Sequence, residues 1–318
     1  MSALATHAGL PMSEPMAFGL AAALAFAIIP FVKLSGLPLI AYRMPPGAIV
    51  RGVRKRLGIT MRRFTFVRPE GGMEALDGAL IEGRVVGLQS SVFWLPYFPE
   101  DMRFHFNAHN LIVYGREGDD YLVSDPVFEE AVRCDRASLK KARFAKGALA
   151  ARGRMYYVER LPRNVDVPGA IPAAIRSNYR MMVQAPLPFV GLRGMRRLGR
   201  TIVALSRDPR RRDDYLPRFL GHVVRMQEEI GTGGAGFRFM YGAFLKESAA
   251  LLAEPKLSDA SAAMTEAGDT WRLFALHASK MCKRREPMDA PALCAIVMQC
   301  ADREAAAWEL ARRAVRHR

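Results

Sequence analysis

Two residues of this chain have the types and the spacing of half a catalytic apparatus. His109 comes just before an apolar run at residues 111–114, and Asp125 ends a second apolar run that begins at Tyr121. The acidic turn at residues 118–120 predicts that the two runs pair as a β-hairpin. Both residues are then expected at the open end of the hairpin, where a carboxylate can orient an imidazole as a general base. The alternative is a structural histidine beside a loop-capping aspartate.

A metal site is the weaker interpretation of the histidines. His105 lies four residues before His109, and this spacing points two rings the same way only on a helix. Phe104, Phe106 and the β-rich run after His109 argue against a helix, and no third ligand follows at a suitable spacing. The sequence therefore predicts no metal site.

A glycine-rich stretch, Gly231 to Gly236, could present backbone N–H groups to a phosphate at a helix N-terminus. It lacks the Lys-Ser/Thr pair and the preceding strand of a P-loop, and it lacks the context of a dinucleotide fingerprint. A tight turn between two helices is the favoured interpretation. No cofactor is predicted.

The whole chain has a formal net charge of +16 at pH 7, and most of this positive charge lies in its second half. Residues 1–150 hold 18 Lys and Arg against 14 Asp and Glu, whereas residues 151–318 hold 29 against 17. We expect Arg193, Arg196, Arg197 and Arg200 to form a surface for an acidic partner, with a solvated face as the alternative. Nucleic acid is the weaker candidate because residues 193–212, which include these arginines, contain no aromatic residue that could stack on bases.

The elements that must position these residues indicate an α+β fold in two parts. Residues 1–160 alternate helices with strands that are mostly antiparallel, and residues 161–318 are helical in pattern. A linker is expected around Pro162, Pro168 and Pro172. The individual predictions are helices over 2–8, 14–29, 49–57, 70–82 and 137–144, strands over 64–67, 85–88 and 155–158, the hairpin, and six later helices at about 170–184, 190–205, 212–230, 235–253, 258–285 and 289–316.

Two composition features bear on the location of the protein. The uncharged run from Met16 to Val32 is too short for a membrane span and contains Pro30, so a buried helix is predicted rather than a transmembrane segment. The four cysteines, Cys134, Cys282, Cys294 and Cys300, form no CxxC pair and no disulfide framework. A reducing cytoplasm is the simplest expectation, and oligomeric state is not predicted.

Several motifs together resemble a known family. They are Gly9 to Glu14 with Phe18-Gly19-Leu20, Leu95 to Pro99, Phe104 to His109, Tyr121 to Pro126 and Ala142 to Gly147. In this order they resemble the N-terminal domain of the butirosin-biosynthesis protein H family, which implies a papain-like fold related to C39 peptidases. The segment from Glu229 to Leu245 resembles the companion helical domain, DUF4872.

The resemblance implies an acyltransferase that moves an acyl group from the thioester of an acidic acyl carrier protein to a small amine. The family mechanism uses a cysteine nucleophile, with His109 and Asp125 matching the base and the orienting residue. The matching cysteine position falls just upstream of Met1, so either a longer N-terminus supplies it or this is a nucleophile-less paralogue. Ser2 is a poor substitute at a chain end.

Three functions remain open. The first is a thiol acyltransferase, or a cysteine peptidase or amidohydrolase with the same apparatus. The second is a non-catalytic binding module of a biosynthetic pathway that holds its partner in the same cleft. The third is a peripheral membrane or nucleic-acid binder, whose affinity would fall steeply with salt.

Overall fold

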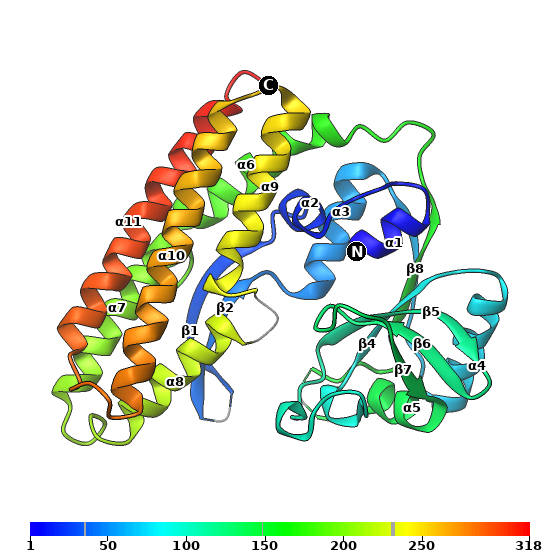
Figure 1. Ribbon diagram of the computed structural model, residues 1–318, viewed down its shortest axis with the longest axis horizontal. Helices are drawn as coiled ribbons and strands as arrows, with labels where there is room; N and C mark the ends of the chain where they lie inside the picture. Colours follow the sequence, from blue (N-terminus) through cyan, green and yellow to red (C-terminus); the bar gives the residue numbers. More distant parts are fainter. Residues whose placement is uncertain (35, 148, 230–232) are drawn as a thin grey trace. The chain divides into compact units, whose positions relative to one another are not determined.

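The computed structural model describes residues 1–318 except residues 35, 148 and 230–232 (Figure 1). The chain forms two compact units. We call residues 1–13 and 53–165 the sheet unit, and residues 14–52 and 166–318 the helical unit. The change near residue 160 that the sequence predicts is present, but residues 14–52 group with the later segment. Among the described residues, no helix is both long enough and apolar enough to cross a membrane.

The sheet unit is built on six antiparallel strands in the order β3-β8-β4-β5-β6-β7. Its elements are α1 (Ser2–His7), β3 (Thr60–Phe64), α4 (Pro69–Ile81), β4 (Val86–Ser90), the 3-10 turns η1 (Val92–Trp94) and η2 (Glu100–Met102), β5 (His109–Glu117), β6 (Asp120–Ser124), β7 (Val132–Asp135), α5 (Arg136–Phe144) and β8 (Met155–Arg160). Helix α3 (Pro46–Leu57) crosses the division between the units.

Alternation along the strands sends one set of side chains into the core. On β4 and β5, Val86 pairs with Val113 and Leu88 with Leu111, and all four are buried. Residues that face each other across antiparallel strands share a face of the sheet, so this face packs against α4 and α5. Ser90 and His109 continue the same series at the end of the strands.

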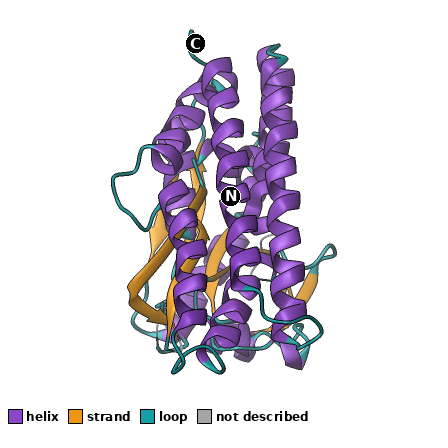
Figure 2. Ribbon diagram, turned by 90° about the vertical axis from the view of Figure 1, so that its left-hand side faces the viewer, coloured by secondary structure: helices purple, strands orange, loops and turns teal. Residues whose placement is uncertain are grey.

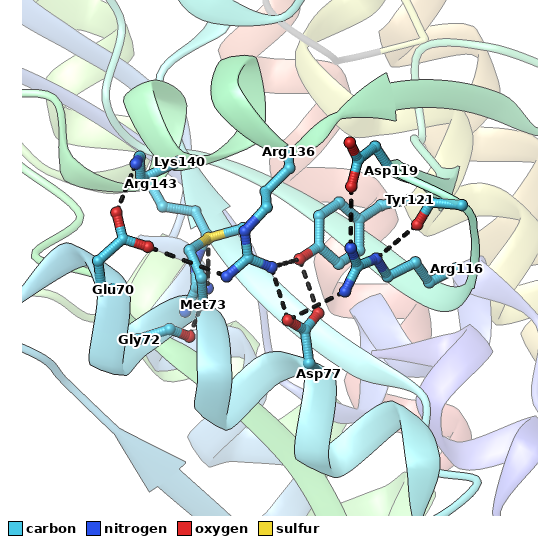
Figure 3. Close-up of polar contacts among 11 residues, drawn as sticks. Glu70, Gly72, Met73, Asp77, Arg116, Asp119, Tyr121, Arg136, Lys140 and Arg143 are labelled. Atoms are coloured by element: carbon cyan, nitrogen blue, oxygen red, sulfur yellow. Dashed lines mark hydrogen bonds and ion pairs between the residues drawn. The ribbon is translucent and has the colours of Figure 1, made fainter.

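Polar contacts fasten α4 and α5 to the sheet (Figure 3). Asp77 on α4 accepts hydrogen bonds from the Tyr121 hydroxyl at 2.7 Å and from Nη1 of Arg136 at 2.6 Å. Arg143 is fully buried, and it donates to the carbonyl oxygens of Gly72 at 2.7 Å and Gly153 at 3.1 Å. Burial lowers the pKa of Arg143 to about 10.

The helical unit contains a two-stranded hairpin and long helices. Its elements are α2 (Glu14–Leu20), β1 (Leu24–Leu34), β2 (Leu37–Arg43), α6 (Val167–Val183), α7 (Gly191–Arg207), α8 (Tyr215–Glu228), the 3-10 turn η3 (Ala235–Phe237), α9 (Arg238–Leu252), α10 (Lys256–Cys282) and α11 (Ala290–Ala314). Helix α11 packs along both α10 and α7, and Figure 2 shows the long helices side by side. In their core, Arg238 and Trp271 both bond to the buried carboxylate of Glu304.

The predicted buried helix over residues 14–29 is wrong beyond Leu20. The chain turns at Ala22, whose φ is 51°, and then enters β1. Strand β1 pairs with β2, and the N–H of Ile28 donates to the carbonyl oxygen of Phe189. Because Pro30 has no N–H and its ring opposes a continuous helix, this apolar run is better accommodated as a strand once a partner strand is present.

Smaller differences concern element ends. The strand predicted over residues 64–67 lies at Thr60–Phe64, because Gly58 ends α3 with a left-handed φ of 64°. Neither β2 nor β7 is among the strands that the sequence predicts. The linker is shorter than expected because α6 begins at Val167, with Asp166 capping the N–H of Gly169. The remaining predicted helices are present, with ends shifted by a few residues.

Candidate active site

His109 and Asp125 come together at the end of the β5–β6 hairpin, as predicted from their spacing. Gly118, with a φ of 58°, begins the two-residue turn between Glu117 and Asp120. The Nε2 atom of His109 lies 2.6 Å from Oδ2 of Asp125. The aspartate side chain is fully buried and that of the histidine is 11 % exposed. The two groups are therefore joined in a largely dry setting with one edge of the ring open to solvent.

The hydrogen bonds around Asp125 bear on the tautomer of His109. Oδ2 also accepts from the Tyr97 hydroxyl at 2.9 Å, and Oδ1 accepts from the N–H of Val127 at 3.0 Å. The Asp125 carboxylate therefore has three hydrogen-bond partners, the His109 ring, the Tyr97 hydroxyl and the Val127 N–H. A carboxylate at Nε2 places the ring proton of a neutral His109 on that nitrogen, which leaves Nδ1 as the proton acceptor.

Aromatic rings enclose the pair. The Phe98 ring meets the His109 ring edge to face at 5.6 Å between centroids, and Phe128 packs against Phe98 at 5.0 Å. Burial, together with the Asp125 carboxylate, raises the pKa of Tyr97 far above its ordinary value. Tyr97 therefore stays protonated and remains a donor, so the segment at residues 96–98 holds both members of the pair in place.

Two residues at this site were missed from the sequence. Tyr97 lies in the Leu95–Pro99 segment that contributed to the family resemblance, but its spacing alone gave no reason to place it on Asp125. Ser90 lies opposite His109 in the β4–β5 register, and its buried Oγ has no hydrogen-bond partner among the described residues. Only the strand register brings this hydroxyl to the same face of the sheet as the imidazole.

The sheet unit supplies no reactive thiol among its described residues. Cys134 is buried in β7, and its Sγ lies 3.7 Å from the carbonyl oxygen of Asp135. Burial, with a further contribution from Asp135, raises the pKa of Cys134 to about 12. A thiol with this pKa stays protonated at neutral pH and does not serve as the nucleophile. The other three cysteines belong to the helical unit.

The second histidine does not join the first. The His105 ring is exposed and stacks on Phe93 with 4.0 Å between centroids, whereas His109 contacts Phe98 and Asp125. Among the described residues, no group of three or more His, Cys, Asp or Glu side chains is arranged to hold a metal ion.

The arginines predicted to bind a partner lie on α7. Arg196 forms an ion pair with Asp302 at 2.7 Å, and Arg193 donates to the carbonyl oxygen of Pro186. Arg197 and Arg200 form no ion pair with any residue that the structure describes. The four side chains are exposed or half-buried, so the helix presents positive charge beside its buried apolar face.

The glycine-rich stretch is only partly described, since Gly231 and Thr232 lie outside the described residues. From Gly233 to Phe237 every residue has a positive φ. The N–H of Ala235 donates to Glu228, and the carbonyl oxygen of Gly236 accepts from Arg238. Its described part is thus a close-packed connection to α9, in line with the interhelical turn that the sequence favours.

Comparison with protein families assigns most of the chain. Residues 1–126 match the family described as Butirosin biosynthesis protein H, N-terminal. Residues 137–310, more than half of the chain, match the family described as Domain of unknown function (DUF4872). A search of curated proteins found no match. The chain belongs to the DUF4872 family and carries, ahead of that domain, an N-terminal domain of the butirosin biosynthesis protein H type.

Proposed function

We propose that this protein is an acyltransferase that moves an acyl group from a carrier-protein thioester to an amine, with His109 as general base and Asp125 as its orienting partner. The observation that carries the proposal is the 2.6 Å contact from Nε2 of His109 to a buried carboxylate, which leaves Nδ1 to take a proton. The N-terminal family match supports the reaction class, and a papain-like origin of the sheet unit is part of the proposal.

The chemistry assigned to the pair is proton transfer. In the covalent route, Nδ1 takes the proton of a nucleophilic cysteine thiol, which is not among the described residues of the sheet unit. The sulfur of that cysteine bonds to the thioester carbon, and the donor thiol leaves with the proton. The amine then attacks the new thioester, its proton passes to Nδ1, and the departing sulfur takes the proton back. In the direct route, Nδ1 takes the proton from the amine as the amine attacks the donor thioester, and the donor sulfur leaves with it. Asp125 stabilises the imidazolium in both routes.

The test is acyl transfer from an N-acetylcysteamine thioester to an aminoglycoside or a simple primary amine, followed by mass spectrometry. We expect His109→Ala to lower the rate by about 10²- to 10⁴-fold, the usual contribution of a general base, and Asp125→Asn to lower it substantially. His277→Ala is the matched control, because His277 also contacts a carboxylate, Glu286 at 3.1 Å, but on the surface.

Four outcomes separate the alternatives. A gain of one acyl mass on the protein before the amine is added supports the covalent route, and transfer without that gain supports the direct route. No transfer by the wild-type protein, with carrier binding retained, contradicts the proposal and supports a non-catalytic binding module. Thioester or amide hydrolysis without transfer supports the hydrolase alternative.

A further inference from the structure

The loop between β4 and β5 and helix α5 together build a second feature of the sheet unit. A cavity of about 470 Å³ is lined by Phe93, Trp94, Pro96, Glu100 and Arg103 from this loop and by Lys141 from α5. Its volume lies within the range of small-molecule sites. None of these residues belongs to the His109–Asp125 pair.

The wall of the cavity is aromatic. Phe93 and Trp94 meet edge to face with 5.0 Å between their centroids, and Trp94 is 38 % exposed. Nζ of Lys141 lies 5.4 Å from the centre of the Trp94 ring. An aromatic wall with a cation over one of its rings suits a planar or apolar group that carries negative charge.

Arg103 presents a fixed second cation. Its Nε donates to the carbonyl oxygen of Phe98 at 2.7 Å, and its Nη2 donates to that of Pro96 at 2.6 Å. Two bonds to one short segment hold the guanidinium in a single orientation. Neither Arg103 nor Lys141 forms an ion pair with a carboxylate among the residues that the structure describes. Glu100 leaves the lining with one net positive charge, which matches a monoanion.

From this arrangement we infer that the cavity is a binding site for a small molecule with a monoanionic group, such as a carboxylate or a phosphodiester, on a planar or apolar body. Trp94 and Phe93 contact the body, and Lys141 and Arg103 pair with the anion. Arg103 also binds the carbonyl oxygens of Pro96 and Phe98, on either side of Tyr97; the Tyr97 side chain contacts Asp125 and that of Phe98 contacts His109. An anion bound to Arg103 is thus connected to the candidate active site through Phe98, which accepts a hydrogen bond from Arg103 and contacts His109.

The site has a built-in reporter. The chain has three tryptophans, and Trp271 and Trp308 are fully buried, so an added small ligand acts on the fluorescence of Trp94. The probes are phenylacetate, its neutral isostere phenylacetamide, the cation phenethylamine, and methyl phenyl phosphate, a monoanionic phosphodiester. Calorimetric titration of the same probes measures binding independently of the fluorescence.

We expect saturable quenching by phenylacetate, with phenylacetamide and phenethylamine binding at least tenfold more weakly. The methyl phenyl phosphate arm shows whether a phosphodiester is accepted as well as a carboxylate. Lys141→Gln is expected to weaken phenylacetate binding by about tenfold. Lys140→Gln is the matched control and should leave binding unchanged, because Lys140 is the preceding residue of α5 but pairs with Glu70 at 2.5 Å.

Equal affinity for phenylacetate and phenylacetamide, no saturable signal by either method, or equal effects of the two lysine variants would each overturn the inference. The assay requires no turnover. Its outcome is therefore independent of whether His109 and Asp125 catalyse acyl transfer.

Discussion

At the scale of single residues, the pair at residues 109 and 125 was predictable from the chain, but the groups that hold it were not. A hairpin with a short turn determines which residues meet at its open end, so counting from Gly118 places His109 beside Asp125. Tyr97 reaches Asp125 from a loop, across 28 residues of sequence. No periodicity describes such a contact, because the path of the loop is set by the packing of Phe98 and Phe128.

Tyr97→Phe isolates the contribution of the hydrogen bond from the Tyr97 hydroxyl to Asp125. The change keeps the ring but removes one of three donors to a buried carboxylate, and a hydrogen bond to a charged group is worth about 1.5–3 kcal/mol. We expect urea unfolding to show a loss of stability of about that size, together with slower acyl transfer. Tyr114→Phe is the control, since Tyr114 is 41 % exposed on β5. Equal losses for the two variants would count against a role for the Tyr97 hydroxyl.

At the scale of elements, a local pattern predicted helix or strand correctly where it fits only one of the two. It failed where the same pattern fits both. The apolar faces of α4 and α5 and the alternation in β5 each admit one structure. The run from Met16 to Val32 is apolar on every side, so it fits a buried helix or a buried strand equally. The outcome depends on β2, which supplies the partner strand from residues 37–43, and on the contact of Ile28 with Phe189.

Arg143 shows how elements are joined by a residue whose role depends on the fold. Arg143→Lys keeps the positive charge, but one ammonium group does not reproduce the geometry that reaches both Gly72 on α4 and Gly153 before β8. A buried acceptor left unpaired costs about 1–3 kcal/mol, so we expect a loss of stability of roughly that size. Arg133→Lys, at an exposed position of β7, should cost less than about 0.5 kcal/mol. Thermal unfolding of the three proteins measures both changes, and a neutral Arg143→Lys would show that one donor suffices.

At the scale of the whole molecule, the pattern of strands followed by helices indicated a fold in two parts, and the distribution of charged residues gave the uneven charge. Neither predicted the path of the chain through the units. Residues 14–52 join the helical unit because their apolar strands and α2 pack against α7 and α9. That assignment is a property of long-range packing, and the composition of the segment does not reveal it. Charge is different, since it adds up along the sequence whatever the fold.

The charge of the second half therefore gives a prediction that separates the effect of where the positive charge lies from the effect of the total charge. We expect Arg197→Glu/Arg200→Glu to slow association with an acidic carrier protein by about tenfold or more at low salt, because steering acts mainly on the association rate. Arg284→Glu/Arg285→Glu changes the net charge by the same amount at two exposed residues beyond the end of α10. Stopped-flow binding at several salt concentrations compares the two variants, and turnover of a small thioester should be unchanged in both. If the two variants slow binding equally, the overall charge of the protein steers the partner and α7 has no special part in docking.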